Sequence, residues 1–255
     1  IKCPETILNI ICTKKLVEKI PSGSKIFYIA ENQSWEKFLI NETLNKNIDT
    51  YGSVHSLVNK WDLRFNDVFS KKSFSPTKLL INGRYNKSVI DSFIKNYPYE
   101  FVEALRYNSL KPISKLNKNN ILVCGSIEIN PTLKMLDEIS KSKKVISNFN
   151  LLFKPHPANK VDLSKYNFLL PYKASNSYFL TIGPDPTSII VDFYLRGIPY
   201  ITYLSDEYVN SNFFKILRTD LFFSSFLKLE KIIFNKKIIL KKNKTNDIFF
   251  LNKKL

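Results

Sequence analysis

The chain has 255 residues, of which 44% are hydrophobic, and a formal net charge of +17 at pH 7. This length and composition suit one large or two small globular domains, and no apolar stretch reaches the roughly 18–20 residues that a membrane-spanning helix needs. Almost all of the basic residues are Lys, whereas proteins that read nucleic acid rely on Arg, so the charge favours an anionic substrate or an anionic membrane surface over nucleic acid.

Apolar runs bounded by turn residues alternate with segments of helical periodicity in the first half of the chain. In chain order these are a buried strand over Lys25–Ala30, a helix over Trp35–Leu44, a strand over Lys78–Ile81, a helix over Asn86–Lys95 and a short strand over Glu100–Val102. Ser34 is a suitable N-cap for the first helix, and Asn82-Gly83 ends the second strand. Because the sequence begins with Ile1 rather than Met, we expect the natural start to lie before it.

The segment Lys111–Asn120 is polar and rich in Lys and Asn, which predicts a linker that acts as a hinge. The same alternation restarts after it. Its elements are strands over Ile121–Cys124, Asn150–Phe153, Tyr178–Ile182 and Tyr200–Tyr203, with helices over Thr132–Ser142 behind Pro131 and over Ser188–Leu195 before Gly197. The tail from Lys228 to Leu255 predicts a solvated final helix in preference to a basic amphipathic surface element.

Strands that alternate with helices favour parallel sheets covered by helices. We therefore predict an α/β protein of two Rossmann-like half-domains with an interdomain cleft. We expect residues 1–115 to form the N-terminal, acceptor-side half, truncated at its start, and residues 116–255 to form the C-terminal, nucleotide-binding half. Cys3, Cys12 and Cys124 are far apart without metal or redox spacing, so we expect reduced thiols, no structural metal and a cytoplasmic protein.

A rigid basic segment, Phe153-Lys154-Pro155-His156-Pro157, stands at the end of a predicted buried strand. Ligands of open α/β sheets bind at the carboxyl ends of strands, and the two prolines restrict the backbone that carries Lys154 and His156. A cation beside an imidazole suits a phosphate or diphosphate. The alternative is an ordinary surface loop, and we favour the phosphate site.

A second anion site is predicted where Gly183-Pro184-Asp185-Pro186 leads into a helix that begins with Thr187 and Ser188. Free backbone N–H groups at a helix start bind anions, and the two hydroxyl groups add donors. Asp192 lies one turn after Ser188 on the same helix face, where it can accept hydrogen bonds from ribose hydroxyls. The alternative is that Thr187 or Ser188 only caps the helix. Together with the basic segment, these residues predict a nucleotide-binding site.

The first half supplies candidate catalytic residues. Glu31 follows a strand end, and His55 and Asp62 are polar positions in an otherwise apolar stretch. We expect the three to converge on one wall of the cleft, with Glu31 or Asp62 as base or nucleophile and His55 as the third candidate.

The acceptor-side candidates are close to these residues in the sequence. Trp35 and Trp61 are the two tryptophans, whose aromatic faces pack well on sugar rings, and Arg64 follows Trp61. The alternatives are that both tryptophans are core residues and that Arg64 forms a surface ion pair with Asp62.

The basic segment and the Thr187-Ser188 pair together resemble the nucleotide-binding half of GT-B glycosyltransferases. The resemblance is greatest to enzymes that use CMP-activated acidic sugars, such as bacterial sialyltransferases and Kdo transferases. Polymerases that transfer glycerol phosphate from CDP-glycerol carry a similar Lys-Pro-His-Pro.

A series of motifs follows in the first half of the chain: Glu31-Asn32-Gln33-Ser34-Trp35-Glu36, His55-Ser56, Trp61-Asp62-Leu63-Arg64-Phe65, Leu79-Leu80-Ile81-Asn82-Gly83-Arg84-Tyr85 and Val102-Glu103-Ala104-Leu105-Arg106-Tyr107. In this order, they resemble a family of bacterial surface-carbohydrate biosynthesis proteins, and the resemblance covers the chain from Ala30 to Tyr203. The sequence departs from that family's pattern at Arg84, where Pro is expected, and at Asp192, where Glu is usual.

The resemblance implies a GT-B fold and transfer of a sugar such as Kdo or sialic acid from a CMP donor to a growing surface glycan, such as lipopolysaccharide or capsule. Because no Asp-x-Asp motif stands near the donor motifs, we expect the transfer to be metal-independent. No cofactor is expected besides this nucleotide sugar. The acceptor is expected to be a glycan or a lipid-linked glycan, and the location the inner face of the cytoplasmic membrane, with peripheral contact to anionic lipid. The donor-binding residues are expected to be Lys154, His156, Thr187 and Ser188 for the phosphate and Asp192 for the ribose.

Two alternatives stay open. One is a CDP-glycerol-type polyol-phosphate transferase, in which His55 is the candidate base. The other is a non-catalytic basic protein that binds nucleic acid or membrane. Positive charge gathered in the cleft favours a nucleotide enzyme, and charge spread over an outer face favours the binding protein.

Overall fold

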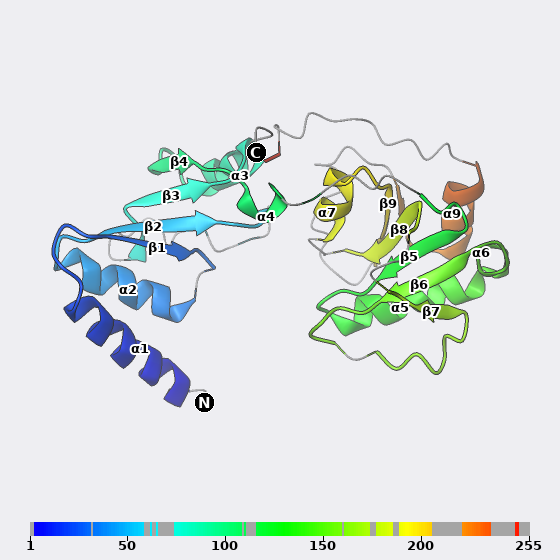
Figure 1. Ribbon diagram of the computed structural model, residues 1–255, viewed down its shortest axis with the longest axis horizontal. Helices are drawn as coiled ribbons and strands as arrows, with labels where there is room; N and C mark the ends of the chain where they lie inside the picture. Colours follow the sequence, from blue (N-terminus) through cyan, green and yellow to red (C-terminus); the bar gives the residue numbers. More distant parts are fainter. Residues whose placement is uncertain are drawn as a thin grey trace. The chain divides into compact units, whose positions relative to one another are not determined.

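The computed structural model describes residues 3–31, 33–58, 62, 65, 74–108, 110, 116–159, 161–173, 177–185, 189–205, 221–235 and 248–249. The chain divides into two compact units, Ile1–Asn108 with Lys244–Leu255, and Ser109–Asn243. Each unit holds one parallel sheet with helices packed against it (Figure 1). The predicted α/β class with two parallel sheets is therefore confirmed.

The first unit holds a four-stranded sheet in the order β1-β2-β3-β4, in which all neighbouring strands are parallel. Its strands are β1 (Lys25–Ile29), β2 (Asp49–Val54), β3 (Lys78–Ile81) and β4 (Tyr99–Phe101). Its helices are α1 (Cys3–Glu18), α2 (Ser34–Leu44), α3 (Arg84–Phe93) and the short α4 (Leu105–Asn108). Of these, α1, β2 and α4 are absent from the predicted elements.

Helices α1, α2 and α3 all lie against one face of this sheet. Tyr28 packs with α1 and α2, Leu79 packs with α3, and the pairing register places Tyr28, Gly52 and Leu79 on the same face. For α2 and α3 the reason is topological, because right-handed crossovers between strands added in chain order place every connecting helix on the same side. Helix α1 precedes β1 and packs against α2. On the opposite face, Phe27 and Ile29 are 65% and 52% exposed. The described helices thus leave that face open.

The second unit holds a six-stranded parallel sheet in the order β10-β9-β8-β5-β6-β7. Its strands are β5 (Asn120–Cys124), β6 (Asn150–Lys154), β7 (Leu169–Pro171), β8 (Leu180–Pro184), β9 (Tyr200–Tyr203) and β10 (Phe222–Phe223). Its helices are α5 (Ile129–Lys141), α6 (Lys143–Asn148), α7 (Ile189–Leu195) and α9 (Phe226–Glu230), which a π-helical turn over Lys231–Asn235 follows.

The direction of strand addition reverses at β5 in this sheet. Strands β6 and β7 extend it on one side, and β8, β9 and β10 extend it on the other. The helices therefore cover both faces: α5, α6 and α9 pack on the face that carries Ile121 and Ile182, and α7 packs on the other, where Phe193 stacks on Tyr200. Gly197 follows α7 with φ of 76°, the left-handed conformation that its position predicts. Open α/β sheets bind ligands outside the carboxyl ends of strands at such a switch point.

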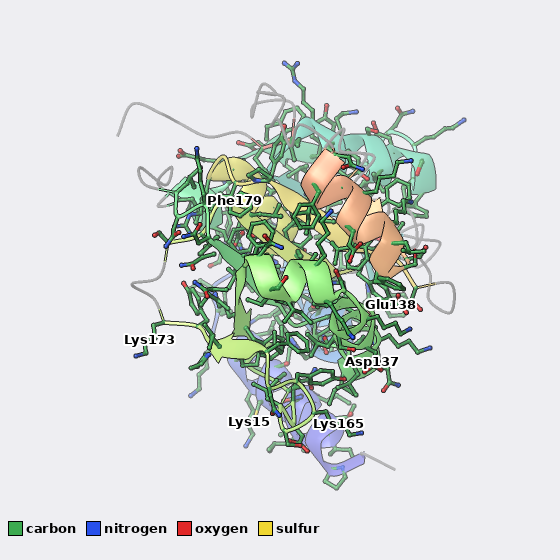
Figure 2. The ribbon with its side chains drawn as sticks, turned by 90° about the vertical axis from the view of Figure 1, so that its right-hand side faces the viewer. Lys15, Asp137, Glu138, Lys165, Lys173 and Phe179 are labelled. Atoms are coloured by element: carbon green, nitrogen blue, oxygen red, sulfur yellow. The ribbon has the colours of Figure 1, made fainter. Side chains whose placement is uncertain are left out.

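Helix α9 belongs to the core of the second unit. Leu229 is fully buried there, so the predicted solvated helix is wrong for this segment. Two acidic residues of α5 tie the surrounding elements together (Figure 2). Asp137 accepts a hydrogen bond from the Tyr166 hydroxyl (2.9 Å), and Glu138 accepts one from the backbone N–H of Phe226 (2.9 Å) at the start of α9.

The division between the units differs from the predicted boundary at 115/116. The second unit begins at Ser109, and residues 244–255 group with the first unit. In that last segment Phe249 is fully buried, and its ring centroid lies 4.4 Å from that of Tyr107. Asn120, the last residue of the predicted linker, is the first residue of β5. Phe249 therefore packs within the first unit.

Candidate functional sites at two strand edges

Polar residues follow all four strands of the first sheet at its carboxyl edge. Glu31 comes shortly after β1, His55 directly after β2, Asn82 directly after β3 and Glu103 shortly after β4. Because the carboxyl ends of parallel strands meet at one edge, segments far apart in the sequence come together here. This edge is the first candidate site.

The structure brings together two of the three candidate catalytic residues. The Nε2 of His55 lies 3.6 Å from Oε1 of Glu31, and the side chains are 32% and 48% exposed. This distance is that of an ion pair with the protonated imidazole and is longer than a hydrogen bond. The pair is open enough to meet a substrate, and an imidazole beside a carboxylate can accept and release a proton near neutral pH.

Glu36 holds the segment that carries Glu31. Its Oε1 accepts hydrogen bonds from the backbone N–H groups of Glu31 (3.0 Å) and Gln33 (2.9 Å), and the residue is 2% exposed. Gln33 is the N-cap of α2, so the prediction of Ser34 as N-cap is wrong. A carboxylate three residues after the N-cap satisfies backbone donors that the helix leaves open, and this role buries it.

Asn86 holds the loop that begins with His55. It is fully buried on α3, and its Oδ1 accepts a hydrogen bond from the backbone N–H of Val58 (2.8 Å). Its Nδ2 donates to the carbonyl of Ser56 (2.7 Å) and to Oδ1 of Asn82 (2.8 Å). One side chain thus joins the loop after β2 to the loop after β3. No sequence pattern marks this role, because the partners of an Asn inside a helix are known only in the folded chain.

Replacing Asn86 with Ala is expected to lower the free energy of unfolding by about 1–3 kcal/mol, because the buried N–H of Val58 and the part-buried carbonyl of Ser56 lose their partner. Asn41→Ala is the matched control, since Asn41 is exposed on α2 and its loss is expected to change stability by less than about 0.5 kcal/mol. Urea denaturation measures both variants. Equal stability of Asn86→Ala and the wild type would contradict the role given to Asn86.

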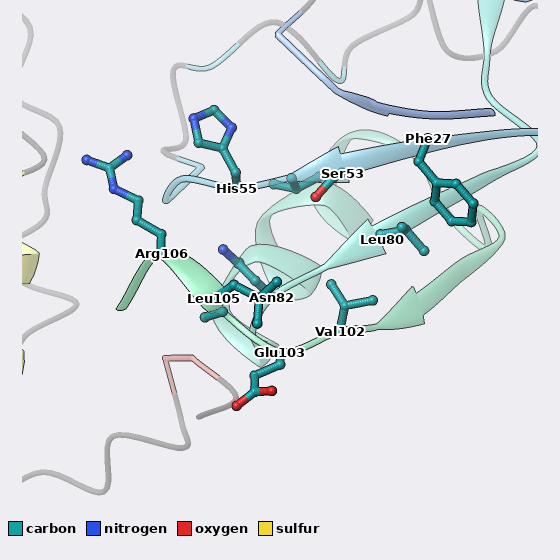
Figure 3. Close-up of a pocket in the computed structure, with 11 residues that line it drawn as sticks. Phe27, Ser53, His55, Leu80, Asn82, Val102, Glu103, Leu105 and Arg106 are labelled. Carbon is teal, nitrogen blue, oxygen red and sulfur yellow. The ribbon is translucent and has the colours of Figure 1, made fainter. Parts of the chain in front are cut away.

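A pocket of about 380 Å³ opens on the exposed face of the first sheet beside this edge (Figure 3). Its volume lies within the range of small-molecule sites, about 300–1,000 Å³. All four strands, or the loops that follow them, contribute to its lining. Its lining includes Phe27, Ser53, His55, Leu80, Asn82, Val102, Glu103 and Arg106.

Of the remaining catalytic and acceptor-side candidates, the structure describes Asp62 and Trp35. Asp62 is half-buried, and Trp61 and Arg64 lie outside the described residues. Trp35 is half-buried, and its ring meets that of Tyr28 edge-on at 6.0 Å, within the core of the helix-covered face. Trp35 therefore lies on the helix-covered face of the sheet, whereas the pocket opens on the other face. Its position fits a core residue better than a residue that contacts the acceptor sugar.

The second candidate site is the carboxyl edge of the second sheet at its switch point. Gly125-Ser126 follows β5, Pro155-His156 follows β6 and Asp185 follows β8. A Cβ atom at Gly125 would lie 3.1 Å from the backbone nitrogen of His156, so glycine at this position allows the loop after β6 to pack closely against the loop after β5. The basic segment is thus part of a packed strand edge.

A hydrogen bond determines which nitrogen of His156 can meet a ligand as a donor. Its Nδ1 accepts from the backbone N–H of Ala158 at 3.2 Å. The proton of the neutral imidazole is then on Nε2, which becomes the donor. Asn159 ties this loop to the neighbouring one, because its Nδ2 donates to the carbonyls of Ser126 and Ile127. The loop therefore carries a positioned N–H donor at the sheet edge.

Lys154 lies beside His156 at the end of β6, half-buried, with Nζ 5.4 Å from the centre of the Tyr172 ring. Its neighbour on β5 is Cys124, which is fully buried. Burial raises the pKa of the Cys124 thiol to about 12, and the charge of Lys154 opposes that rise. The thiol is therefore neutral near pH 7 and does not neutralise the cation of Lys154.

Thiol reagents are expected to modify Cys12, which is exposed, and to spare Cys124 in the native chain at pH 8. The folded pKa of Cys124, about 12, lies above the ordinary value of 9.0. The stability that this neutral thiol contributes is thus complete below about pH 9 and is lost as the pH rises toward 12. Mass spectrometry of labelled peptides checks the reactivity, and equal labelling of both thiols would contradict the burial of Cys124.

The remaining donor-side candidates follow β8. Asp185 is 5% exposed, and its backbone N–H donates to the carbonyl of Tyr203 at 3.0 Å. Thr187 and Ser188 lie outside the described residues, and Asp192 is half-buried in the first turn of α7. Asp185 is a buried carboxylate at the switch point, and the only signal for it in the sequence is its place after a strand.

In the part of the chain that the structure describes, no helix is long and apolar enough to cross a membrane. No protein-family model matches the sequence, and no curated protein matches it. The function is therefore inferred from the residues at the two strand edges.

Proposed function

We propose that this chain is a GT-B-type glycosyltransferase that moves an acidic sugar from a CMP donor to a hydroxyl group of a growing bacterial surface glycan. The observation that carries the proposal is the chemistry of the two strand edges. Glu31 lies 3.6 Å from His55 at one edge, and at the other Lys154 ends β6 and His156 follows it. Glycosyl transfer needs both functions, proton removal from the acceptor and stabilisation of a leaving phosphate.

In this proposal the second unit binds the donor. Lys154 and the Nε2–H of His156 contact the donor phosphate, with Nδ1 of His156 held by the backbone. Thr187 and Ser188 add hydroxyl and backbone donors, and Asp192 accepts hydrogen bonds from the ribose. Contacts to a charged phosphate strengthen as CMP departs with additional negative charge, so they stabilise the transition state more than the bound donor. We propose that the reaction needs no metal ion.

The first unit supplies the base. The acceptor oxygen forms a bond to the anomeric carbon, the bond from that carbon to the phosphate oxygen breaks, and its electron pair leaves with CMP. The acceptor proton goes to His55, and Glu31 stabilises the imidazolium that results. Glu31 itself is the second candidate for the proton, and Asp62 is the third.

We further propose that the two edges act together across an interdomain cleft that closes on donor binding, with residues 111–119 as the hinge. The net charge of +17 favours capture of an anionic donor and contact with the anionic inner face of the cytoplasmic membrane. This charge is the reason for proposing a peripheral, cytoplasmic location.

A CDP-glycerol-type polyol-phosphate transferase is the second candidate function. The observation that favours it is again the Glu31–His55 pair, since a base for a hydroxyl group serves attack on phosphorus as well as on carbon. Lys154 and His156 then hold a diphosphate. The preferred nucleotide separates the two candidates.

A thermal-shift screen against CMP, CDP, UDP and GDP tests the proposal. A ligand at 100 times its Kd stabilises the folded chain by about 2.7 kcal/mol. We expect CMP to raise the unfolding midpoint of the wild type most and to raise that of His156→Ala less. Lys143→Ala is the control, because Lys143 is exposed at the start of α6. A shift with CDP alone favours the second candidate, and no shift with any of the four would overturn both.

A further inference from the structure

The open face of the first sheet carries an apolar strip that leads to the Glu31–His55 pair. Phe27 on β1 is 65% exposed, and its ring stacks on that of Tyr51 at 4.9 Å between centroids. Leu80 on β3 and Val102 after β4 are half-buried and line the same pocket as Phe27. Large apolar side chains exposed beside polar groups are typical of a binding surface.

The pocket is apolar at one end and polar at the other. In Figure 3, Phe27, Leu80 and Val102 lie together at one end, while the side chains of His55 and Arg106 extend at the other. The apolar end offers a ligand one hydroxyl group, that of Ser53. A ligand that fills the pocket must therefore be apolar along one part of its length.

The polar end carries groups that suit an anion. Arg106 is exposed, with its guanidinium 5.6 Å from the ring centre of Tyr107, and a guanidinium matches phosphate through paired N–H groups. The Oδ1 of Asn82 accepts from Asn86, which leaves the Nδ2 of Asn82 to donate to a ligand. The carboxylate of Glu103 points away from His55 and Arg106 (Figure 3). Arg106 is the cationic side chain of this lining that can pair with an anionic group of a ligand, whereas Glu31 beside His55 carries a negative charge.

We propose that this pocket binds the acceptor and that the acceptor is a lipid-linked phosphate. Its alkyl part lies over Phe27, Leu80 and Val102, its phosphate meets Arg106, and the sugar that follows presents a hydroxyl to the Glu31–His55 pair. The assignment of this ligand as the acceptor rests on the proposed glycosyl transfer. A free oligosaccharide fits less well, because its hydroxyl groups lose their water at the apolar end without gaining partners.

Isothermal titration with octyl phosphate, butyl phosphate and inorganic phosphate, below the micelle concentration of the octyl compound, tests the site without any nucleotide. Each buried methylene raises affinity about fourfold, so octyl phosphate is expected to bind at least about tenfold more tightly than butyl phosphate. Inorganic phosphate is expected to bind most weakly.

Two variants and two controls locate the binding. Arg106→Gln is expected to lower octyl phosphate affinity about ten- to hundredfold, and Leu80→Ser about tenfold. Arg84→Gln and Leu170→Ser are matched controls, because Arg84 is exposed on α3, Leu170 is 45% exposed on β7, and neither lines the pocket. The controls are expected to bind octyl phosphate as the wild type does.

Equal affinity for the three probes, or wild-type affinity in both pocket variants, would overturn the proposal. A dimer that dissociates in Leu80→Ser, seen by light scattering, would overturn it as well, since the strip then joins two copies of the chain. The titration is independent of the nucleotide screen. If the chain binds octyl phosphate but none of the four nucleotides, the proposed glycosyl transfer is wrong and the lipid-phosphate site still stands.

Discussion

Changing Glu31 to Gln is expected to lower the turnover number of sugar transfer by about 10²–10⁴-fold, the usual cost of removing a group that takes part in acid–base catalysis. The change keeps the shape of the side chain and removes the charge that lies 3.6 Å from His55. Affinity for CMP is expected to stay the same, because the donor phosphate contacts other residues. Steady-state kinetics at saturating donor and acceptor measures the effect.

Glu100→Gln is the matched control for this variant. Glu100 is an exposed carboxylate on β4 of the same sheet, 3.2 Å from Nζ of Lys78, and its loss is expected to leave turnover unchanged. If Glu31 and His55 act as a unit, a double variant with His55→Gln will cost little more than either single change. Near-normal turnover of both Glu31→Gln and His55→Gln would move the base to Asp62. Normal turnover of Asp62→Asn as well would end the catalytic proposal.

Changing His156 to Ala is expected to weaken CMP binding about ten- to hundredfold, and adding Lys154→Ala is expected to bring the loss above about a hundredfold. The reason is the loss of charge-assisted contacts to phosphate, from an imidazole whose Nε2–H is set by the bond between Nδ1 and Ala158. Fold stability is expected to change little, since His156 is only half-buried in a loop. Isothermal titration with CMP measures the affinity.

Lys143→Ala is expected to bind CMP as the wild type does, because this exposed lysine of the same unit lies on α6 and not at the sheet edge. The affinity of the wild type for adenosine monophosphate is a second comparison, because this ligand carries the same phosphate group as CMP and differs in its base. Wild-type CMP affinity in the Lys154→Ala, His156→Ala double variant would contradict the phosphate role of this loop.

The strand that leads to the basic segment could be predicted from the sequence because it is covered on both faces. Leu151, Leu152 and Phe153 of β6 are all at most 5% exposed. A strand of a parallel sheet with helices on both sides reads as a continuous apolar run, and the prolines after it mark where it ends. The same reasoning holds for β5, β8 and β9, whose residues are buried without interruption.

β2 and α1 could not be predicted in this way because each is covered on one side only. Buried and accessible positions alternate along β2, and its sequence DTYGSV holds few apolar residues to show that pattern. On α1, Ile7, Leu8 and Ile11 are exposed, so the apolar side chains do not gather on the buried face. Tertiary pairing, and not local sequence, determines these two elements.

The candidate site, too, depends on tertiary contacts that the local sequence does not reveal. The convergence of Glu31 and His55 was predicted from the place of Glu31 after a strand and from His55 as a polar position in an apolar stretch. The strand that brings His55 to the same edge, β2, was not predicted. The groups that hold them, Glu36 and Asn86, depend on backbone partners in other loops, which no spacing reveals. The return of Phe249 to the first unit is likewise a contact between distant parts of the chain.

The measurement that tests the central proposal most directly is the release of CMP when the wild-type chain is mixed with a CMP-linked acidic sugar and an alkyl-phosphate-linked glycan acceptor. CMP-linked sialic acid and CMP-linked Kdo are the two donors to use. We predict that one of them gives CMP release that depends on the acceptor and is suppressed in both Glu31→Gln and His156→Ala. Release no faster than in buffer from both donors, in a chain whose unfolding midpoint CMP does not raise, would contradict the proposal that this protein transfers sugars from CMP.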